Sequence, residues 1–326
     1  MKLPRTMRIL APALSLALTA CLDPLSQLAG GGIGGTGISV VGVVTGFGSV
    51  FVSGVEYQTS NATTYDVDSN GTASQSDLKI GMVVNLNGAF AADGTPQAQK
   101  IVYRPSVKGP VVCNPDGSLT VLQQTVKTDG NPTYDGFNCQ TGNGKVIDVS
   151  GLHDANGVIH ATRVGLVSNA TAGQVYEAHG QVSNLVNTGG TQTFTLGQLS
   201  VNFAGVTPVP TKLVNGARVE VKGTLGSTPT TLNATGISFE DGESKPRNTR
   251  ASIEGLITTI SSSTTFQVGN QQVGNQQVVT NQNTTITDVN NNVLSANQLA
   301  VGWRIEVSGT FDADGNVVAT RVHQER

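Results

Sequence analysis

Charged side chains are scarce in this sequence. Asp, Glu, Lys and Arg make up 13% of the 326 residues, half the usual share of roughly 25%. The net charge is −3 and no segment gathers Lys and Arg. Because duplex nucleic acids are bound mainly by neutralising phosphates, we expect no nucleic-acid partner. For the same reason we expect no stable electrostatic attachment to anionic lipid.

Aromatic residues and recognisable catalytic motifs are also scarce. Phe, Trp and Tyr total 5%, too few for convincing recognition of single-stranded nucleic acid. The sequence contains no Gly-x-Ser-x-Gly elbow, no His-Glu-x-x-His and no paired-carboxylate motif, so we expect no enzymatic activity. Ser, Thr, Asn, Gln and Gly take the place of charged residues. That composition is typical of half-exposed strands joined by turns.

The N-terminus predicts export and lipidation. A basic start (residues 1–8) precedes an apolar stretch (residues 9–18) that is shorter than the about 20 residues of a transmembrane helix. Leu18-Thr19-Ala20-Cys21 follows and resembles the lipobox of bacterial lipoproteins. The resemblance implies cleavage after residue 20 and acylation of Cys21, which would anchor the chain in the lipid bilayer. The alternative is an ordinary cleaved signal with an incidental cysteine.

The segment after the signal peptide predicts where in the cell envelope the protein is located. Residues 21–39 contain the run AGGGIGGTG, which is typical of a flexible tether. Leu22, rather than Asp, follows Cys21 directly, and this favours the outer membrane. We therefore expect an outer-membrane lipoprotein that faces the periplasm or the cell surface.

One module occurs four times. An eight-residue signature lies between two glycines, with apolar residues at positions four and six and polar residues at positions five and seven. This period of two predicts a half-buried strand. A Gly-x-Val/Ile motif opens each copy, and an Ala-x-x-Ile/Val motif closes it, in three copies after an Asp-Gly or Asn-Gly hairpin tip. The signatures are GMVVNLNG (81–88), GKVIDVSG (144–151), GARVEVKG (216–223) and GWRIEVSG (302–309).

The repeats predict the domain organisation. Each copy holds about five strands in about 60 residues, and closure into a barrel would remove the exposed edges of such a short sheet. We predict an all-β chain of four tandem five-stranded OB-like barrels; small β-sandwiches are the alternative. The predicted modules are residues 40–104, 107–169, 178–240 and 252–325, with a linker at 241–251.

Three segments carry a family resemblance: GGIGGTG, GVVTGFGSVFVSGVEY and DLKIGMVVNLNG. They resemble the bacterial family catalogued as domain of unknown function 5666. The resemblance covers most of the chain; it is closest in copy one and loosest in copy two, which lacks a clear DLxxG lead. It implies repeated OB-like modules on envelope lipoproteins, and it implies no activity.

Two further cysteines, Cys113 and Cys139, both lie in copy two. Exported compartments are oxidising, so an even pair within one small module predicts a disulfide. Closing a loop of about 25 residues would stabilise the module by roughly 3 kcal/mol.

A candidate calcium loop lies in copy one. The run DVDSNGT (66–72), with an acidic residue at the twelfth position, fits the pattern of EF-hand-type loops. No flanking helices are predicted and Asp replaces the usual Glu, so a plain hairpin turn is the alternative. We expect no other cofactor. The candidate Ca²⁺ ligands are Asp66, Asp68, Asn70, Thr72 (through its carbonyl) and Asp77.

The single tryptophan, Trp303, follows the first glycine of the copy-four signature. We expect its ring to plug one end of a barrel. The alternative is a stacking surface for a sugar or a base.

Together these features predict an envelope-anchored lipoprotein whose β-modules bind an envelope protein, a glycan or peptidoglycan, or act as a spacer. A first alternative is a carrier of a small molecule or an oligosaccharide through the OB-like barrels. A second is a hydrolase of envelope polymers, which would need converging carboxylates in a pocket.

Overall fold

The computed structural model describes residues 37–239, 246–270 and 274–326. The predicted signal peptide, Cys21 and most of the predicted tether lie outside these residues. Within them the chain is almost entirely β-structure, and its few helices are single turns. No helix in the described ranges has the length and apolarity needed to cross a bilayer.

Copy one folds into a closed barrel. The first strand pairs antiparallel with the second and the fourth, and the fourth pairs antiparallel with the fifth. A parallel bridge between Gln58 and Gln97 joins the end of the third strand to the fifth and closes the ring. A further hairpin, β4 (Thr64–Val67) and β5 (Asn70–Ala73), continues the parallel pairing. The five barrel strands are β1 (Gly37–Phe47), β2 (Val50–Val52), β3 (Val55–Tyr57), β6 (Val83–Phe90) and β7 (Pro96–Tyr103).

Copies two, three and four repeat these pairings, including the parallel contact of third and fifth strands. This is the strand order of an OB-type barrel, so the predicted fold is confirmed. Copy two contains β8 (Val107–Cys113), β9 (Leu119–Val121), β10 (Gln124–Lys127), β11 (Thr133–Asp135), β12 (Val146–His153) and β13 (Ile159–Ser168). Copy three contains β14 (Val175–Thr188), β15 (Thr191–Leu196), β16 (Leu199–Asn202), β17 (Arg218–Leu225) and β18 (Thr231–Phe239). Copy four contains β19 (Arg250–Ser262), β20 (Thr265–Asn270), β21 (Gly274–Val279), β22 (Thr285–Thr287), β23 (Val293–Leu294), β24 (Arg304–Phe311) and β25 (Val317–Gln324).

Single helical turns precede the fourth strand in three copies. They are η1 (Gln75–Asp77), α2 (Cys139–Gly142) and η2 (Ala296–Gln298).

The two glycines of the strand signature have different backbone roles. The first glycine has a positive φ in every copy, between 80° and 90°, a conformation that other residues rarely adopt. The second lies at a β-bulge, where a Cβ atom would fall well inside van der Waals distance of a carbonyl oxygen on the fifth strand. The bulge glycines are Gly88, Gly151, Gly223 and Gly309.

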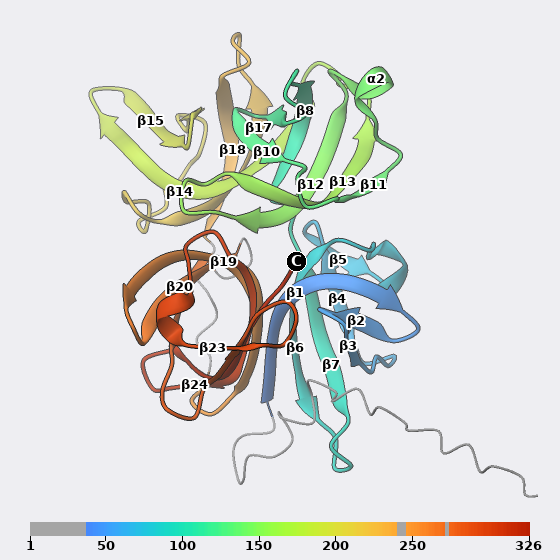
Figure 1. Cartoon of the computed structure of the whole chain (residues 1–326). Coiled ribbons are helices and arrows are strands. Elements are labelled where there is room, and N and C mark those ends of the chain that lie inside the picture. The colour runs from blue at the N-terminus through green and yellow to red at the C-terminus, as the bar shows by residue number, and fades with distance from the viewer. Residues whose placement is uncertain (1–36, 240–245, 271–273) are drawn as a thin grey trace, which may run out of the picture.

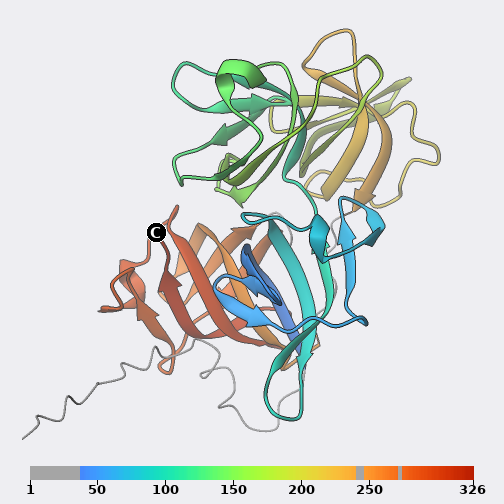
Figure 2. The ribbon, with the colours of Figure 1, turned by 90° about the vertical axis from the view of Figure 1, so that its right-hand side faces the viewer.

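The barrels pair out of sequence order (Figures 1 and 2). Strands β1 and β19 run parallel, from Ile38–Arg250 to Val41–Ile253, and join barrel one to barrel four. Strands β8 and β14 pair through Lys108–Glu177 and Val107–Ala178 and join barrel two to barrel three. Strand β12 of barrel two contacts β6, β19 and β20. The two pairs therefore lie against one another as two tiers.

Besides β14, which starts at Val175, two strands begin earlier than the predicted modules. β1 starts at Gly37, within the predicted tether, and β19 starts at Arg250, within the predicted linker. In both cases the added residues belong to the β1–β19 pairing between barrels, which starts at Ile38 and Arg250.

Candidate functional site: a groove between barrels one and two

The floor of the groove is an ion-pair cluster on barrel two. Arg163 on β13 is 5% exposed, and its guanidinium donates to Asp148 (Nη1–Oδ2 2.7 Å) and Asp135 (Nη2–Oδ2 2.8 Å). Gly165 is the cross-strand partner of both carboxylates. A Cβ atom at position 165 would collide with the guanidinium, so glycine lets Arg163 lie flat across the strand and reach both partners. Burial opposes the charge, but Asp148 and Asp135 raise the pKa of Arg163 above its ordinary value.

Hydrogen bonds beneath the groove join the two barrels. The Tyr103 hydroxyl of barrel one donates to Asp148 (3.2 Å). Thr162 Oγ1 of barrel two donates to the carbonyl of Gly81 in barrel one (2.6 Å). Burial raises the pKa of Tyr103 well above its ordinary value, so the phenol stays a donor. The groove is therefore built on a fixed interface and is preformed.

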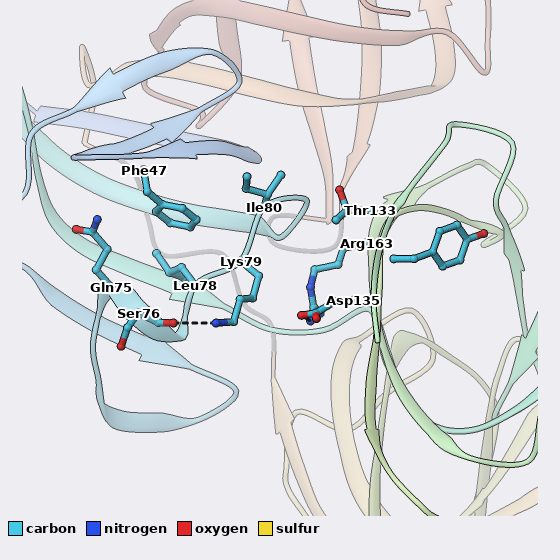
Figure 3. A pocket seen from close by; sticks show the side chains of 10 residues that line it. Phe47, Gln75, Ser76, Leu78, Lys79, Ile80, Thr133, Asp135 and Arg163 are labelled. Carbon is cyan, nitrogen blue, oxygen red and sulfur yellow. Dashed lines mark hydrogen bonds and ion pairs between the residues drawn. The ribbon is translucent and has the colours of Figure 1, made fainter. Parts of the chain in front are cut away.

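Exposed apolar side chains of barrel one border the hollow (Figure 3). Phe47 (41% exposed) and Ile80 (47%) project from barrel one, and Tyr134 (51%) belongs to β11 of barrel two. Phe47 and Tyr134 are the only exposed aromatic side chains in the part of the chain that the structure describes. The hollow measures about 620 Å³, within the range of roughly 300–1,000 Å³ typical of ligand pockets.

Polar groups surround these rings. Gln75, Ser76, Lys79 and Thr133 line the same hollow. Lys79 Nζ donates to the carbonyl of Ser76 (3.0 Å), as Figure 3 shows. Ring faces beside hydroxyl, amide and ammonium groups suit a ligand with both apolar faces and polar edges.

The carboxylates of the predicted calcium loop are engaged by cations. Asp66 forms a two-point ion pair with Arg104, with Nη2–Oδ2 at 2.7 Å and Nη1–Oδ1 at 3.0 Å. Asp68 pairs with Lys108 Nζ of barrel two at 2.5 Å. A bound ion would have to replace both ion pairs, and the calcium site stays a prediction.

The other candidate calcium ligands follow in the chain. Asn70 and Thr72 lie in β5, and Asp77 lies in η1. The Asp77 carboxylate accepts a hydrogen bond from the backbone of Ser74 (2.8 Å), and this bond lowers the pKa of Asp77. Asp77 thus caps its own helical turn.

Barrel three contains a buried charged cluster that was not predicted from the sequence. His179 Nε2 lies 2.8 Å from Glu177 Oε1, and Lys222 Nζ lies 3.3 Å from Glu177 and 2.9 Å from Glu220. One ligand atom from each of Glu177, His179 and Glu220 lies within 4.8 Å of the others, a spacing that suits a cation. Lys222 already bridges both carboxylates, and these raise its pKa against the effect of burial. The alternation of polar and apolar residues along the strand did not predict this cluster. Glu220 occupies a polar position of the strand signature, which alternation predicts to be exposed, but Arg104 of barrel one lies against it.

The other residues singled out in the sequence are two cysteines and the single tryptophan. Cys113 and Cys139 form the predicted disulfide, with an S–S distance of 2.09 Å, and tie β8 to α2. Trp303 is half-buried and packs against the core of barrel four. It does not line the groove, and its role as a stacking surface stays a prediction.

Comparison with solved structures gives a weak likeness. The chain "drosophila Unr CSD456" is 14% identical, and the match covers 68% of this chain and 98% of that one with a TM-score of 0.17. This likeness carries no argument about arrangement or ligand. No curated protein matches the chain.

A family profile matches three of the four barrels. The family is described as "Domain of unknown function (DUF5666)", and the match covers residues 40–102, 108–165 and 254–323, more than half of the chain. Copy two, the loosest by its motifs, is among the matched regions, whereas copy three is not, although its strand pairings are the same. The chain therefore belongs to the DUF5666 family.

Proposed function

We propose that this protein is a non-enzymatic lipoprotein of the outer membrane that binds an envelope glycan. Acylated Cys21 is its anchor, and the groove between barrels one and two is its binding site. The observation that carries the proposal is that Phe47 of barrel one and Tyr134 of barrel two, the two exposed aromatic residues of the described part, both line one hollow of about 620 Å³. The apolar face of a sugar ring packs on such side chains, while its hydroxyl groups bond to the polar rim.

The position of Phe47 supports this assignment. It ends β1, at the turn into β2. In OB-type barrels the loop between the first two strands borders the surface that binds oligosaccharides and oligonucleotides. The charge of the groove favours the first class, because Arg163 is neutralised by Asp135 and Asp148 and only Lys79 remains for phosphates.

The groove favours binding over hydrolysis. Asp135 is the one carboxylate among the described residues that line it, and Arg163 holds that carboxylate. Glycoside hydrolysis normally needs two carboxyl groups on either side of the bond. The barrel interiors are filled by side chains such as Tyr57 and Phe194, which disfavours carriage of a ligand inside a barrel.

Co-sedimentation with purified peptidoglycan sacculi tests the proposal. We use the full chain carrying Cys21→Ala and compare it with a Phe47→Ala/Tyr134→Ala double variant. Two lost ring contacts of about 1 kcal/mol each predict at least a tenfold weaker apparent affinity. Tyr134→Phe keeps the ring and should bind as the parent does.

Val214→Ala is the control, because Val214 is 55% exposed and lies outside the groove. Sedimentation that the double variant leaves unchanged would show that the glycan binds elsewhere. An absence of binding to sacculi and to soluble envelope polysaccharide would overturn the glycan assignment.

A further inference from the structure

The groove continues at both ends into smaller hollows. A hollow of about 410 Å³ beside η1 shares Gln75 with the groove. A hollow of about 230 Å³ shares Ile80 and Thr133 with it and reaches Arg304 of barrel four. Because the groove shares lining residues with each smaller hollow, the three lie next to one another, and we call them the track. It runs from barrel one, past barrel two, to barrel four.

We infer that this track binds a linear, uncharged polysaccharide through several consecutive sugar residues. The inference rests on the proposed function and names the ligand class of the same site. A single small sugar would need only the central hollow. A polymer can occupy all three and gain contacts with each added residue.

Neutral polar groups line both outer hollows. They predominate in the hollow beside η1, whereas in the other hollow they lie beside the apolar side chains of Val43, Val44 and Ile80. Hydroxyl and amide groups can donate to and accept from sugar hydroxyls. They include Thr59, Ser60, Asn61, Ser74, Thr45 and Asn131. The one cation there, Arg304, is held by Glu254 through Nε at 2.8 Å. Charge therefore gives a uniformly anionic polymer no advantage in the outer hollows.

Gln75 lies at the junction of two hollows in a fixed orientation. Its Oε1 accepts from Thr59 Oγ1 (3.1 Å) and from the Tyr65 hydroxyl (3.4 Å). Its Nε2 donates to no group within the described residues. The two hydroxyls thus hold the amide so that its N–H groups are available to a sugar that passes from the outer hollow to the central one.

Calorimetric titration with chitooligosaccharides and cello-oligosaccharides of two, four and six sugars tests the inference. The protein is the full chain carrying Cys21→Ala. We expect Kd to fall at least tenfold from two sugars to six in one of the two series. Asn61→Ala and Asn131→Gly each remove an amide from one outer hollow. Each should weaken hexasaccharide binding three- to tenfold and leave disaccharide binding unchanged, whereas Phe47→Ala should weaken both.

Matched controls separate these effects from changes in folding. Asn156→Ala removes an exposed amide outside the track. Asn291→Gly replaces an exposed residue that has positive φ, as Asn131 does. Both should bind all lengths as the parent does.

The outcomes distinguish the two proposals. Disaccharide binding that depends on Phe47 but does not tighten with length would overturn the extended track and leave the groove proposal intact. No heat with any sugar, together with no binding to sacculi, would overturn both. Binding of an extended peptide at the free edge of β11, in place of the sugars, would assign the track to a protein partner and overturn the inference.

Discussion

Glu254 on β19 and Glu306 on β24 are direct cross-strand partners, and both side chains are buried. Glu254 is held by Arg304, whereas Glu306 accepts a hydrogen bond from Ser252 (2.8 Å) and lies 3.7 Å from Arg321. Burial, together with the charge of Glu254, raises the pKa of Glu306 to about 7 despite the bond from Ser252. Like charges placed opposite each other in a sheet are unfavourable, so barrel four keeps a carboxyl group that prefers its proton.

Glu306 predicts a loss of stability as the pH rises from 4.5 to about 7. Its ordinary pKa is 4.5, whereas in the folded protein it is about 7. Between these values the folded state binds a proton that the unfolded state has lost, so the free energy of unfolding falls with increasing pH by about 3 kcal/mol in total. Glu306→Gln should remove this component of the slope and stabilise the protein at pH 8.

Urea unfolding at several pH values between 4 and 8 measures both effects. Glu56→Gln, at an exposed position of β3, is the control and should keep the parent slope. An unchanged slope in Glu306→Gln would rule out this carboxyl group as the cause.

Adding a methyl group at a bulge glycine should lower the free energy of unfolding. A Cβ atom at Gly309 would collide with the carbonyl oxygen of Val318, and backbone cannot move aside cheaply. Gly309→Ala should lower the free energy of unfolding by about 1–3 kcal/mol. Gly236→Ala is the matched control, because nothing lies within 4 Å of its added Cβ. Equal thermal midpoints for the two variants would contradict the packing argument.

Arg104 connects barrel one to barrel three. It pairs with Asp66 at 2.7 Å and lies 3.8 Å from Glu220, and its side chain is 21% exposed. Arg104→Met should lower the free energy of unfolding by about 2 kcal/mol, because both carboxylates lose a charged partner in a partly buried place. Lys127→Met, on the exposed side of β10, should have little effect in the same urea titration. Similar losses for both variants would mean that Arg104 contributes no specific link.

The Cys113–Cys139 bridge closes a segment of 26 residues. In the chain-entropy account its removal destabilises barrel two by roughly 3 kcal/mol. The double variant Cys113→Ser/Cys139→Ser should therefore melt at a lower temperature than the parent, and a reducing agent should shift the parent but not the variant. A reductant effect that persists in the double variant would point to a different origin.

The proposed lipidation of Cys21 predicts membrane attachment that salt cannot reverse. In fractionated cells the parent should remain with membranes after a high-salt wash, whereas Cys21→Ala should move to the soluble fraction. Metabolic labelling with a palmitate analogue should mark the parent alone. An unlabelled parent that is released by salt would exclude the acyl anchor.

The barrels themselves were predictable because the requirements of their backbone are local and repeated. The first glycine of each signature has a positive φ, and the second faces a carbonyl oxygen across a bulge. Both requirements recur in every copy, so the two glycines repeat in the sequence at the same spacing. The disulfide was predictable for a related reason, since both cysteines lie within one small module.

The groove between barrels one and two is formed by contacts between different copies. These contacts do not recur from copy to copy, so the repeats did not predict them. Phe47 and Tyr134 lie in different copies and line one hollow because barrel two lies against barrel one. Glu220 occupies a position where alternation predicts exposure, yet it is 8% exposed. Sequence alone determined each barrel with its two signature glycines, and the disulfide of barrel two, because these features depend on residues within one module. The tertiary structure alone decided that barrel one joins barrel four, that barrel two joins barrel three, and where the groove opens. Those contacts are made by single, non-repeated side chains far apart in the chain.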